Sequence, residues 1–148
     1  MNLNDKINND LKEALKAGNK VRLKTVRSIK ALILEFEKSG TGKEFNEEEE
    51  IKLLSSAAKK RRESIEEYRK AGREDLASVE EAELNVIIDY LPQQLTEEEI
   101  ETEVKAIAGE IGASGKANFP KLMQASIIKL KGQAEGKAIK AAVEKVLG

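Results

Sequence analysis

The 148-residue chain contains no cysteine, no histidine and no tryptophan, and aromatic residues make up only 3% of it. Without cysteine there is no disulfide, thiolate zinc site or thiol nucleophile, and without histidine the commonest general base and metal ligand is missing. The composition therefore excludes many enzyme classes, and we expect neither a metal nor a cofactor. The core has to be built from Leu, Ile, Val and Ala, for which a chain of this length suffices.

Long hydrophobic runs are missing as well. The longest has four residues, Ala31 to Leu34, whereas a membrane-spanning helix needs about 20. The first residues, Met1 to Asp5, do not resemble a signal peptide. We therefore expect a cytoplasmic protein with no membrane contact.

Prolines are few, and most of the remaining sequence favours helices. Only Pro92 and Pro120 interrupt a chain rich in Ala, Leu, Glu and Lys, which are strong helix formers. Apolar spacing and capping residues predict an all-α fold, with helices over about 3–17, 20–38, 47–71, 76–91, 118–130 and 137–147. A further helix is expected to begin at Glu97, to carry Ile111 and to end within residues 109–115. Because proline disfavours a helix at the residue before it, we expect a domain boundary at Pro92, within residues 91–95. It separates an N-terminal helical domain of about four helices (1–92) from a C-terminal three-helix bundle (93–148).

Three local patterns carry more detailed predictions. Leu3, Ile7, Leu11 and Leu15 are four residues apart and predict one apolar stripe along the first helix. The segment from Thr96 to Glu99 has the spacing of a capping box. The short helix after Pro120 has its apolar positions at Leu122, Met123, Ile127, Ile128 and Leu130.

The net charge of −1 hides an uneven distribution along the chain. Residues 1–30 carry a net charge of +5, residues 31–112 carry −11, and residues 113–148 carry +5. Two basic ends around an acidic middle can be brought together on a shared partner. They can equally pair with the acidic middle inside one molecule.

The segment from Lys129 to Lys137 is the most suggestive stretch for nucleic acid. Its two glycines allow the backbone to approach a phosphate, and the amides at the start of the last helix point outward. The surrounding lysines are Lys129, Lys131, Lys137 and Lys140. The alternative is a plain loop between helices, with glycines for the turn and lysines for solubility. Since the nearby Phe119 is expected in the core, any contact would go to the backbone and shape of an RNA.

Other charged clusters have structural explanations. The basic run Lys59 to Arg62 is followed by the glutamates of Glu63 to Glu67, which can neutralise it along the same helix. The acidic run Glu47 to Glu50 lies where a helix dipole favours acid, so we do not assign it to a metal. The glutamates within Glu80 to Glu83 have no suitable catalytic neighbour in the sequence, and we assign them no catalysis.

Six segments carry a resemblance to a known family. They are residues 12–18 (Lys-Glu-Ala-Leu-Lys-Ala-Gly), 21–27, 62–65, 71–76, 90–95 (Tyr-Leu-Pro-Gln-Gln-Leu) and 129–137 (Lys-Leu-Lys-Gly-Gln-Ala-Glu-Gly-Lys). Together they resemble the GatB/YqeY family of small bacterial proteins over nearly the whole chain. The most specific feature is the Tyr-Leu-Pro segment followed about forty residues later by the Lys-Gly-x-Ala-Glu-Gly-Lys segment.

The resemblance implies a tail similar to that of the B subunit of tRNA-dependent amidotransferases. Those enzymes convert glutamate or aspartate, already attached to a tRNA, to glutamine or asparagine, and the tail is thought to contact the tRNA body. The residues that match the tail motif are Lys129, Lys131, Gly132, Gly136 and Lys137. Gln133 stands where the motif commonly has a basic residue, which implies about one phosphate contact fewer.

Our first hypothesis is therefore a non-catalytic adaptor that binds tRNA, with no DNA partner. Its contacts would be Lys129, Lys131, Lys137 and Lys140, with Arg22 and Arg27 as a second footprint. The second hypothesis is a protein-interaction module whose polar third helix or acidic middle docks an amidotransferase or an aminoacyl-tRNA synthetase.

A third hypothesis, an amidotransferase-like carbon–nitrogen ligase that uses glutamine as amido donor, ranks lower. The sequence has no P-loop, no Ser-Lys amidase arrangement and no metal cluster. The placement of the basic ends discriminates between the first two hypotheses. Basic ends on one face favour RNA, and basic ends packed against acidic helices favour the interaction module.

Overall fold

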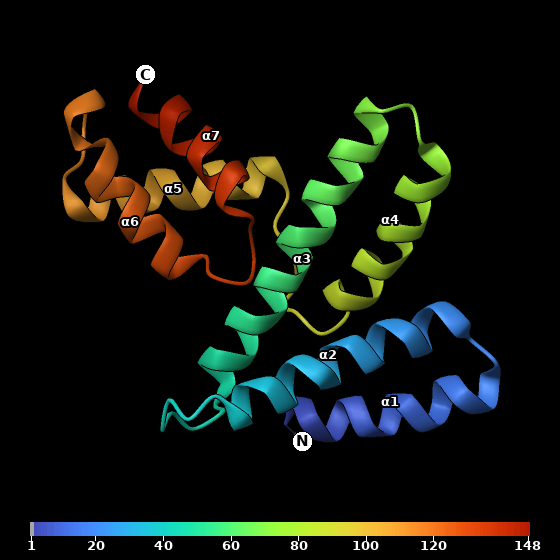
Figure 1. The fold of residues 1–148 in the computed structure, drawn as a ribbon. Coiled ribbons are helices and arrows are strands. Elements are labelled where there is room, and N and C mark those ends of the chain that lie inside the picture. The colour runs from blue at the N-terminus through green and yellow to red at the C-terminus, as the bar shows by residue number, and fades with distance from the viewer. Residues whose placement is uncertain (1) are drawn as a thin grey trace. The chain divides into compact units, whose positions relative to one another are not determined.

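The computed structural model describes residues 2–148, which form helices and connecting turns and no strand (Figure 1). This confirms the predicted all-α class. The helices are α1 (Leu3–Ala17), α2 (Lys20–Lys38), α3 (Glu47–Lys70), α4 (Glu74–Ile88), α5 (Glu97–Ile111), α6 (Phe119–Lys129) and α7 (Gly136–Leu147), with a 3₁₀ turn, η1 (Lys116–Asn118), before α6. Among the described residues, no helix has both the length and the apolar character needed to cross a bilayer.

Helices α1, α2, α3 and α5 begin where short polar side chains cap them. Asn2, Asn19 and Asn46 each accept a hydrogen bond from the backbone N–H three residues further on, at the starts of α1, α2 and α3. At the start of α5, Thr96 and Glu99 form the predicted capping box. Such caps satisfy amides that the first turn of a helix leaves without partners.

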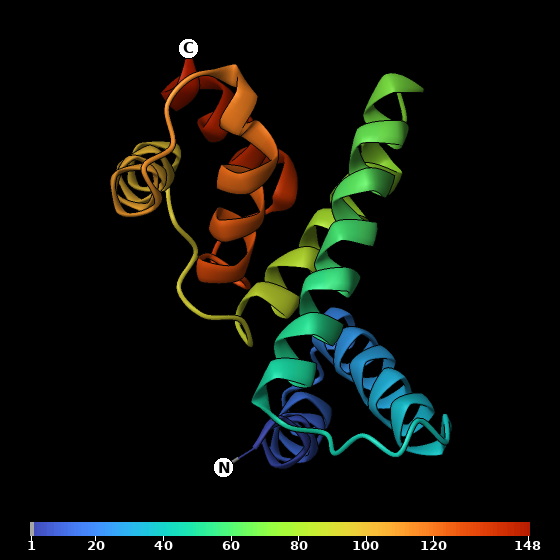
Figure 2. The same ribbon diagram turned by 90° about the vertical axis from the view of Figure 1, so that its left-hand side faces the viewer.

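The chain divides into two compact units, Met1–Leu91 and Pro92–Gly148, called here the N-terminal unit and the tail unit. In the N-terminal unit α1 lies beside α2, and α3 crosses this pair before the chain returns in α4 (Figures 1 and 2). In the tail unit α5 packs against both α6 and α7. Each unit has its own buried aliphatic core, centred on Ile29 and Ile87 in the first and on Val104, Leu122 and Val143 in the second.

Two predicted apolar stripes differ from the observed burial. Leu15 was expected on the buried stripe of α1, but its side chain is 64% exposed, and Ala14 is buried instead. A spacing of four residues advances about 40° further around a helix at each step, so the stripe has left the core side by its fourth member. In α6, Ile127 and Ile128 also lie on the surface, at 42% and 69% exposure.

Candidate nucleic-acid interface

In the tail unit, the second half of the Tyr-Leu-Pro-Gln-Gln-Leu segment lies against the segment 129–137. The Gln94 side-chain amide donates to the Pro92 carbonyl at 2.8 Å and to the Gly132 carbonyl at 2.6 Å. The Leu95 N–H donates to the Gln133 carbonyl at 2.9 Å. The segment after Pro92 therefore fastens the turn between α6 and α7, which gives a physical reason for the two motifs to occur together.

Gly132 is explained by the geometry of this turn. It is buried, and its φ of 81° lies in the left-handed region that glycine adopts without steric cost. The turn continues from α6 through a hydrogen bond from the Gln133 N–H to the Leu130 carbonyl at 2.9 Å. Gly132 thus has a structural role whether or not a ligand binds.

Gly136 has no such explanation. It is the exposed first residue of α7, its φ is not positive, and a Cβ placed on it would meet nothing within 4 Å. The N-cap residue Glu135 makes no capping hydrogen bond with its side chain, as is also the case at the starts of α4 and α6. Glycine therefore weakens the start of α7 without a packing reason.

Three of the predicted lysines are exposed around this glycine. Lys131 lies in the turn, and Lys137 and Lys140 are one helical turn apart at the start of α7. Lys131 and Lys137 each keep an interaction within the chain. We call Lys131, Gly132, Gly136, Lys137 and Lys140 the basic turn.

Lys129 is placed differently from the lysines of the basic turn. Its Nζ lies 3.9 Å from a carboxylate oxygen of Glu103 and 3.9 Å from one of Glu110, both on α5. Its charge is therefore partly matched inside the tail unit. As an RNA contact it remains a prediction.

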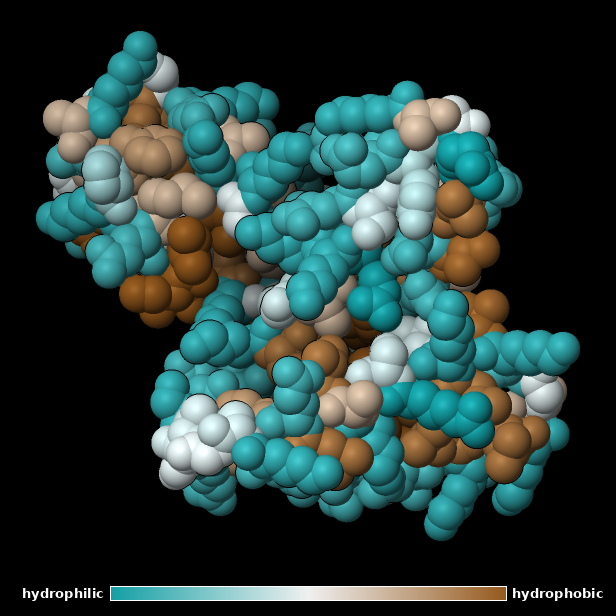
Figure 3. Space-filling model, in the orientation of Figure 1, coloured by the Kyte–Doolittle hydropathy of each residue, from teal (hydrophilic) through white to brown (hydrophobic). Residues whose placement is uncertain are grey.

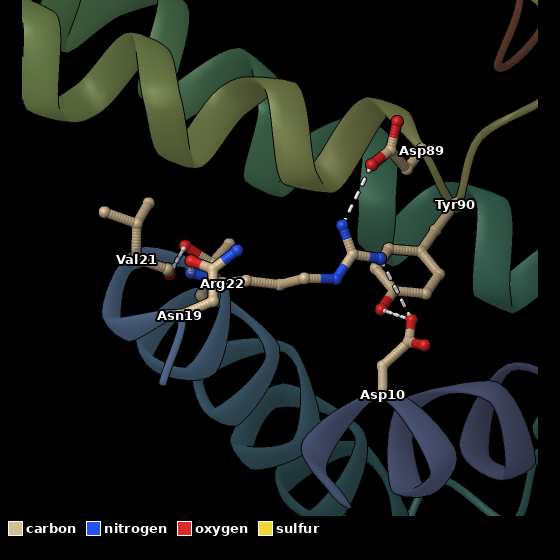
Figure 4. Close-up of polar contacts among 7 residues, drawn as sticks. Asp10, Asn19, Val21, Arg22, Asp89 and Tyr90 are labelled. Carbon is tan, nitrogen blue, oxygen red and sulfur yellow. Dashed lines mark hydrogen bonds and ion pairs between the residues drawn. The ribbon is translucent and has the colours of Figure 1, made fainter. Parts of the chain in front are cut away.

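Arg22 is held between two carboxylates in the N-terminal unit (Figure 4). Its guanidinium nitrogens lie 3.1 Å from Asp10 of α1 and 3.1 Å from Asp89 beyond α4. The ring of Tyr90 lies beside it, 5.8 Å from the guanidinium carbon, and the Tyr90 hydroxyl donates to Asp10. The side chain is only 29% exposed, so its charge already joins α1, α2 and the end of α4.

The electrostatics of this cluster agree with its geometry. Burial lowers the pKa of Arg22, but its hydrogen bonds to Asp89 and Asp10 outweigh that effect, so the pKa is raised. Burial raises the pKa of Tyr90, and the bond to Asp10 raises it further. Both groups keep their protons, and the cluster stays intact, at neutral pH.

Arg27 and Arg22 lie on different sides of α2, and their use as a second RNA footprint remains a prediction. Five residues apart on α2, the two side chains point about 140° away from each other. Arg27 is exposed and forms no ion pair within residues 2–148. Both arginines belong to the N-terminal unit, and the basic turn belongs to the tail unit.

A buried carboxylate that the sequence analysis set aside lies between α2, α3 and α4. Glu83 is only 5% exposed, and its oxygens lie 3.7 Å from Arg61 Nε and 3.4 Å from Lys24 Nζ. The prediction that Glu63 to Glu67 neutralise the basic run is therefore wrong for Arg61, which pairs across to α4. One feature of the sequence could have indicated this burial. Glu83 lies one helical turn before the apolar position Ile87, and therefore on the core side of the helix.

The basic ends of the chain pair with acidic helices inside each unit. Arg22 and Lys24 contact acids of the α4 region, and Lys145 Nζ lies 2.8 Å from Glu101 on α5. Of the two interpretations of the charge pattern, pairing within the molecule holds for these residues.

Comparison with known proteins agrees with the motifs. Residues 4–147 match the family model described as Yqey-like protein. The chain is 34% identical to "Altered inheritance of mitochondria protein 41, mitochondrial" of Pyrenophora tritici-repentis over 143 residues, covering 94% of the chain and 77% of that protein.

Two further fungal proteins of the same name are similar. The Lachancea thermotolerans protein is 35% identical over 71% of the chain and 57% of its own length. The Vanderwaltozyma polyspora protein is 32% identical over 69% of the chain and 56% of its own length. The chain thus spans little more than half the length of these two relatives. With its motifs joined at one turn and the family model matching residues 4–147, the chain belongs to the YqeY-like protein family.

Proposed function

We propose that this protein is an accessory factor, without catalysis of its own, that binds tRNA through phosphates at the basic turn. The observation that carries the proposal is Gly136, an exposed glycine that neither the backbone nor packing requires. It begins a helix without a side-chain cap, beside exposed lysines. A phosphate can approach such a helix start closely, where amides and the helix dipole favour an anion.

The turn also has the rigidity that a binding site needs. Gln94 and Leu95 hold it through two hydrogen bonds, to the Gly132 and Gln133 carbonyls, so its lysines are presented on a fixed backbone. Holding a loop in its bound conformation lowers the entropy lost on binding. The relation of the family to the tail of tRNA-dependent amidotransferases, implied by the resemblance, supports tRNA as the nucleic acid.

The expected binding mode is electrostatic. Three lysines at phosphates predict that the logarithm of affinity falls with the logarithm of salt with a slope of roughly 2 to 3. The nearby aromatic Phe119 is packed against the tail core, so reading of bases by stacking is not expected. Cytoplasmic location, as predicted from the sequence, is part of this proposal.

The first experiment is a titration of the full chain with bulk tRNA and with a DNA duplex of similar length, each at two salt concentrations. We expect salt-sensitive binding in the micromolar range that prefers tRNA. Replacing Lys131 and Lys137 together by glutamate should weaken tRNA binding roughly tenfold or more and reduce the salt slope. The far-UV circular dichroism should stay helical, because exposed substitutions change stability little.

A matched control separates the site from the overall charge. Lys105→Glu with Lys116→Glu makes the same change in charge within the tail unit, at two exposed lysines outside the basic turn. This control should retain most of the affinity. Equal losses in the two double variants, or no loss in the first, would remove the basic turn as the site.

A second candidate function, a protein-docking module for an amidotransferase subunit or an aminoacyl-tRNA synthetase, is compatible with the first. One surface of the tail unit favours protein docking, and it lies on α6 rather than on the polar third helix or the acidic middle.

A further inference from the structure

Helix α6 exposes a group of large aliphatic side chains. Ile127 and Ile128 are among the exposed large hydrophobic residues of the protein. They line a shallow depression of about 380 Å³ together with Phe119, Pro120, Met123 and Gln124. We call these six residues the α6 face. Figure 3 shows hydrophobic side chains gathered over this part of the tail unit.

The tail core does not require these side chains. The buried positions of this segment are Leu122, Ser126 and Leu130, which are four residues apart and lie on the opposite side from Ile128. Isoleucine is only a moderate helix former, so two adjacent exposed isoleucines bring no local advantage. A contiguous apolar surface of this kind marks an interaction site more often than scattered single residues do.

The charged side chains of α6 and of the residues directly beside it are basic, whereas Glu103 and Glu110, which lie beside Lys129, belong to α5. Residues 113–134 contain no acidic side chain. Lys121 lies two helical turns before Ile128 on the same side of α6, and Lys131 follows the helix end, both exposed. A partner that covers the isoleucines therefore meets lysines at both ends of the face.

We propose that the α6 face docks an amphipathic α-helix of another protein, with aliphatic residues at i, i+3 or i+4 and i+7 and with acidic residues on its flanks. Such a helix fills a shallow apolar depression with its apolar side. Its acids lie opposite Lys121 and Lys131. The face thus selects a partner by apolar spacing and by charge together.

The same charges argue against a second copy of this chain. Two α6 faces packed antiparallel would bring Lys121 of one copy near Lys131 of the other, and like charges repel. Nucleic acid is also less suitable here. The exposed members of the face, Pro120, Gln124, Ile127 and Ile128, have no aromatic ring for stacking, and Phe119 is packed against the core.

The test uses a fluorescent helical peptide of about 18 residues, with leucines at the stated spacing and glutamates on the flanks. Its twin carries lysine at every glutamate position. We expect the full chain to bind the acidic peptide and to bind the twin roughly tenfold more weakly. Ile128→Gln should weaken acidic-peptide binding roughly tenfold, and Lys121→Glu severalfold. Leu15→Gln, at a similarly exposed leucine of α1, should have no effect.

Each outcome that departs from these expectations overturns the proposal. Equal binding of the two peptides, no binding of either, or no effect of Ile128→Gln removes the acidic helix as occupant. A wild-type dimer in sedimentation equilibrium that Ile128→Gln disperses assigns the face to a second copy. A loss of tRNA affinity in Ile128→Gln, with the helical spectrum intact, assigns it to RNA. The peptide titration contains no RNA, so its result does not depend on whether the basic turn binds tRNA.

Discussion

Ser126 places a hydroxyl inside the tail core. The residue is fully buried, and its Oγ has no hydrogen-bond partner among the described residues. A buried polar group without a partner is destabilising, and alanine is also the better helix former. We expect Ser126→Ala to raise the free energy of unfolding by about 0.5–1.5 kcal/mol in urea titrations followed by circular dichroism. A lower stability would mean that the hydroxyl is bonded in solution.

Tyr90 gives a prediction about how the stability of the protein depends on pH. Its pKa is raised in the folded protein by burial and by the bond to Asp10, whereas the phenol of an unfolded chain ionises near pH 10. The folded state therefore keeps this proton to a higher pH. The stability it contributes is complete below about pH 10 and is lost as the pH rises further.

Removing the hydroxyl should reveal this dependence. At about pH 8, Tyr90→Phe is expected to lower the free energy of unfolding by about 1 kcal/mol, because the bond to Asp10 is lost. At about pH 11 the difference between wild type and variant should be smaller. Urea unfolding of both proteins at each pH measures this difference in the free energy of unfolding. The same difference at both pH values would contradict the assigned bond.

At the scale of the helix, the start of α7 offers a substitution that separates stability from binding. Gly136→Ala adds a methyl group where nothing lies within 4 Å, so we expect stability to stay the same or rise by up to about 1 kcal/mol. The same methyl group lies where a phosphate would approach. Affinity for tRNA should therefore fall severalfold while the melting temperature does not.

Gly109 in α5 is the matched control for this prediction. It is also exposed and helical, and its Cβ would also meet nothing within 4 Å. Gly109→Ala should stabilise the protein and leave tRNA affinity unchanged. If Gly136→Ala behaves in the same way, the glycine is not used for close approach.

Helix boundaries and helix faces were predictable to different degrees. Capping residues such as Asn46 and Thr96 placed helix starts correctly, because a cap acts within three residues of its own position. The exposure of Leu15 and Ile128 was not predictable. Periodicity locates an apolar side of a helix, but only packing decides whether another element covers it.

At the scale of the whole molecule, the two cores share no residue. Every member of the first lies before Pro92 and every member of the second after it. Ile29→Ala removes a fully buried side chain from the first core and should destabilise the N-terminal unit by about 2–5 kcal/mol. Hydrogen exchange should then accelerate at amides of α1 to α4 and stay unchanged in α5 to α7. Equal acceleration throughout would mean that the units unfold together.

The candidate site was only partly predictable at this scale. The sequence pointed to Lys131, Lys137 and Gly136 through a motif, and the structure places them around one fixed turn. It also pointed to Arg22, whose guanidinium proves to be held by Asp10 and Asp89. Local spacing cannot show such a pairing, because the Arg22 and Asp89 side chains are 67 residues apart in the chain.

The sequence by itself determined the helical class, the ends of most helices and the family, since these depend on propensities, caps and motifs within a few residues. Only the tertiary structure decided which charges remain for a partner. It paired Arg61 with Glu83, joined Gln94 to Gly132 and left Ile128 outside the core. These outcomes depend on contacts between segments far apart in the chain, and such contacts are settled by packing and burial of the folded units.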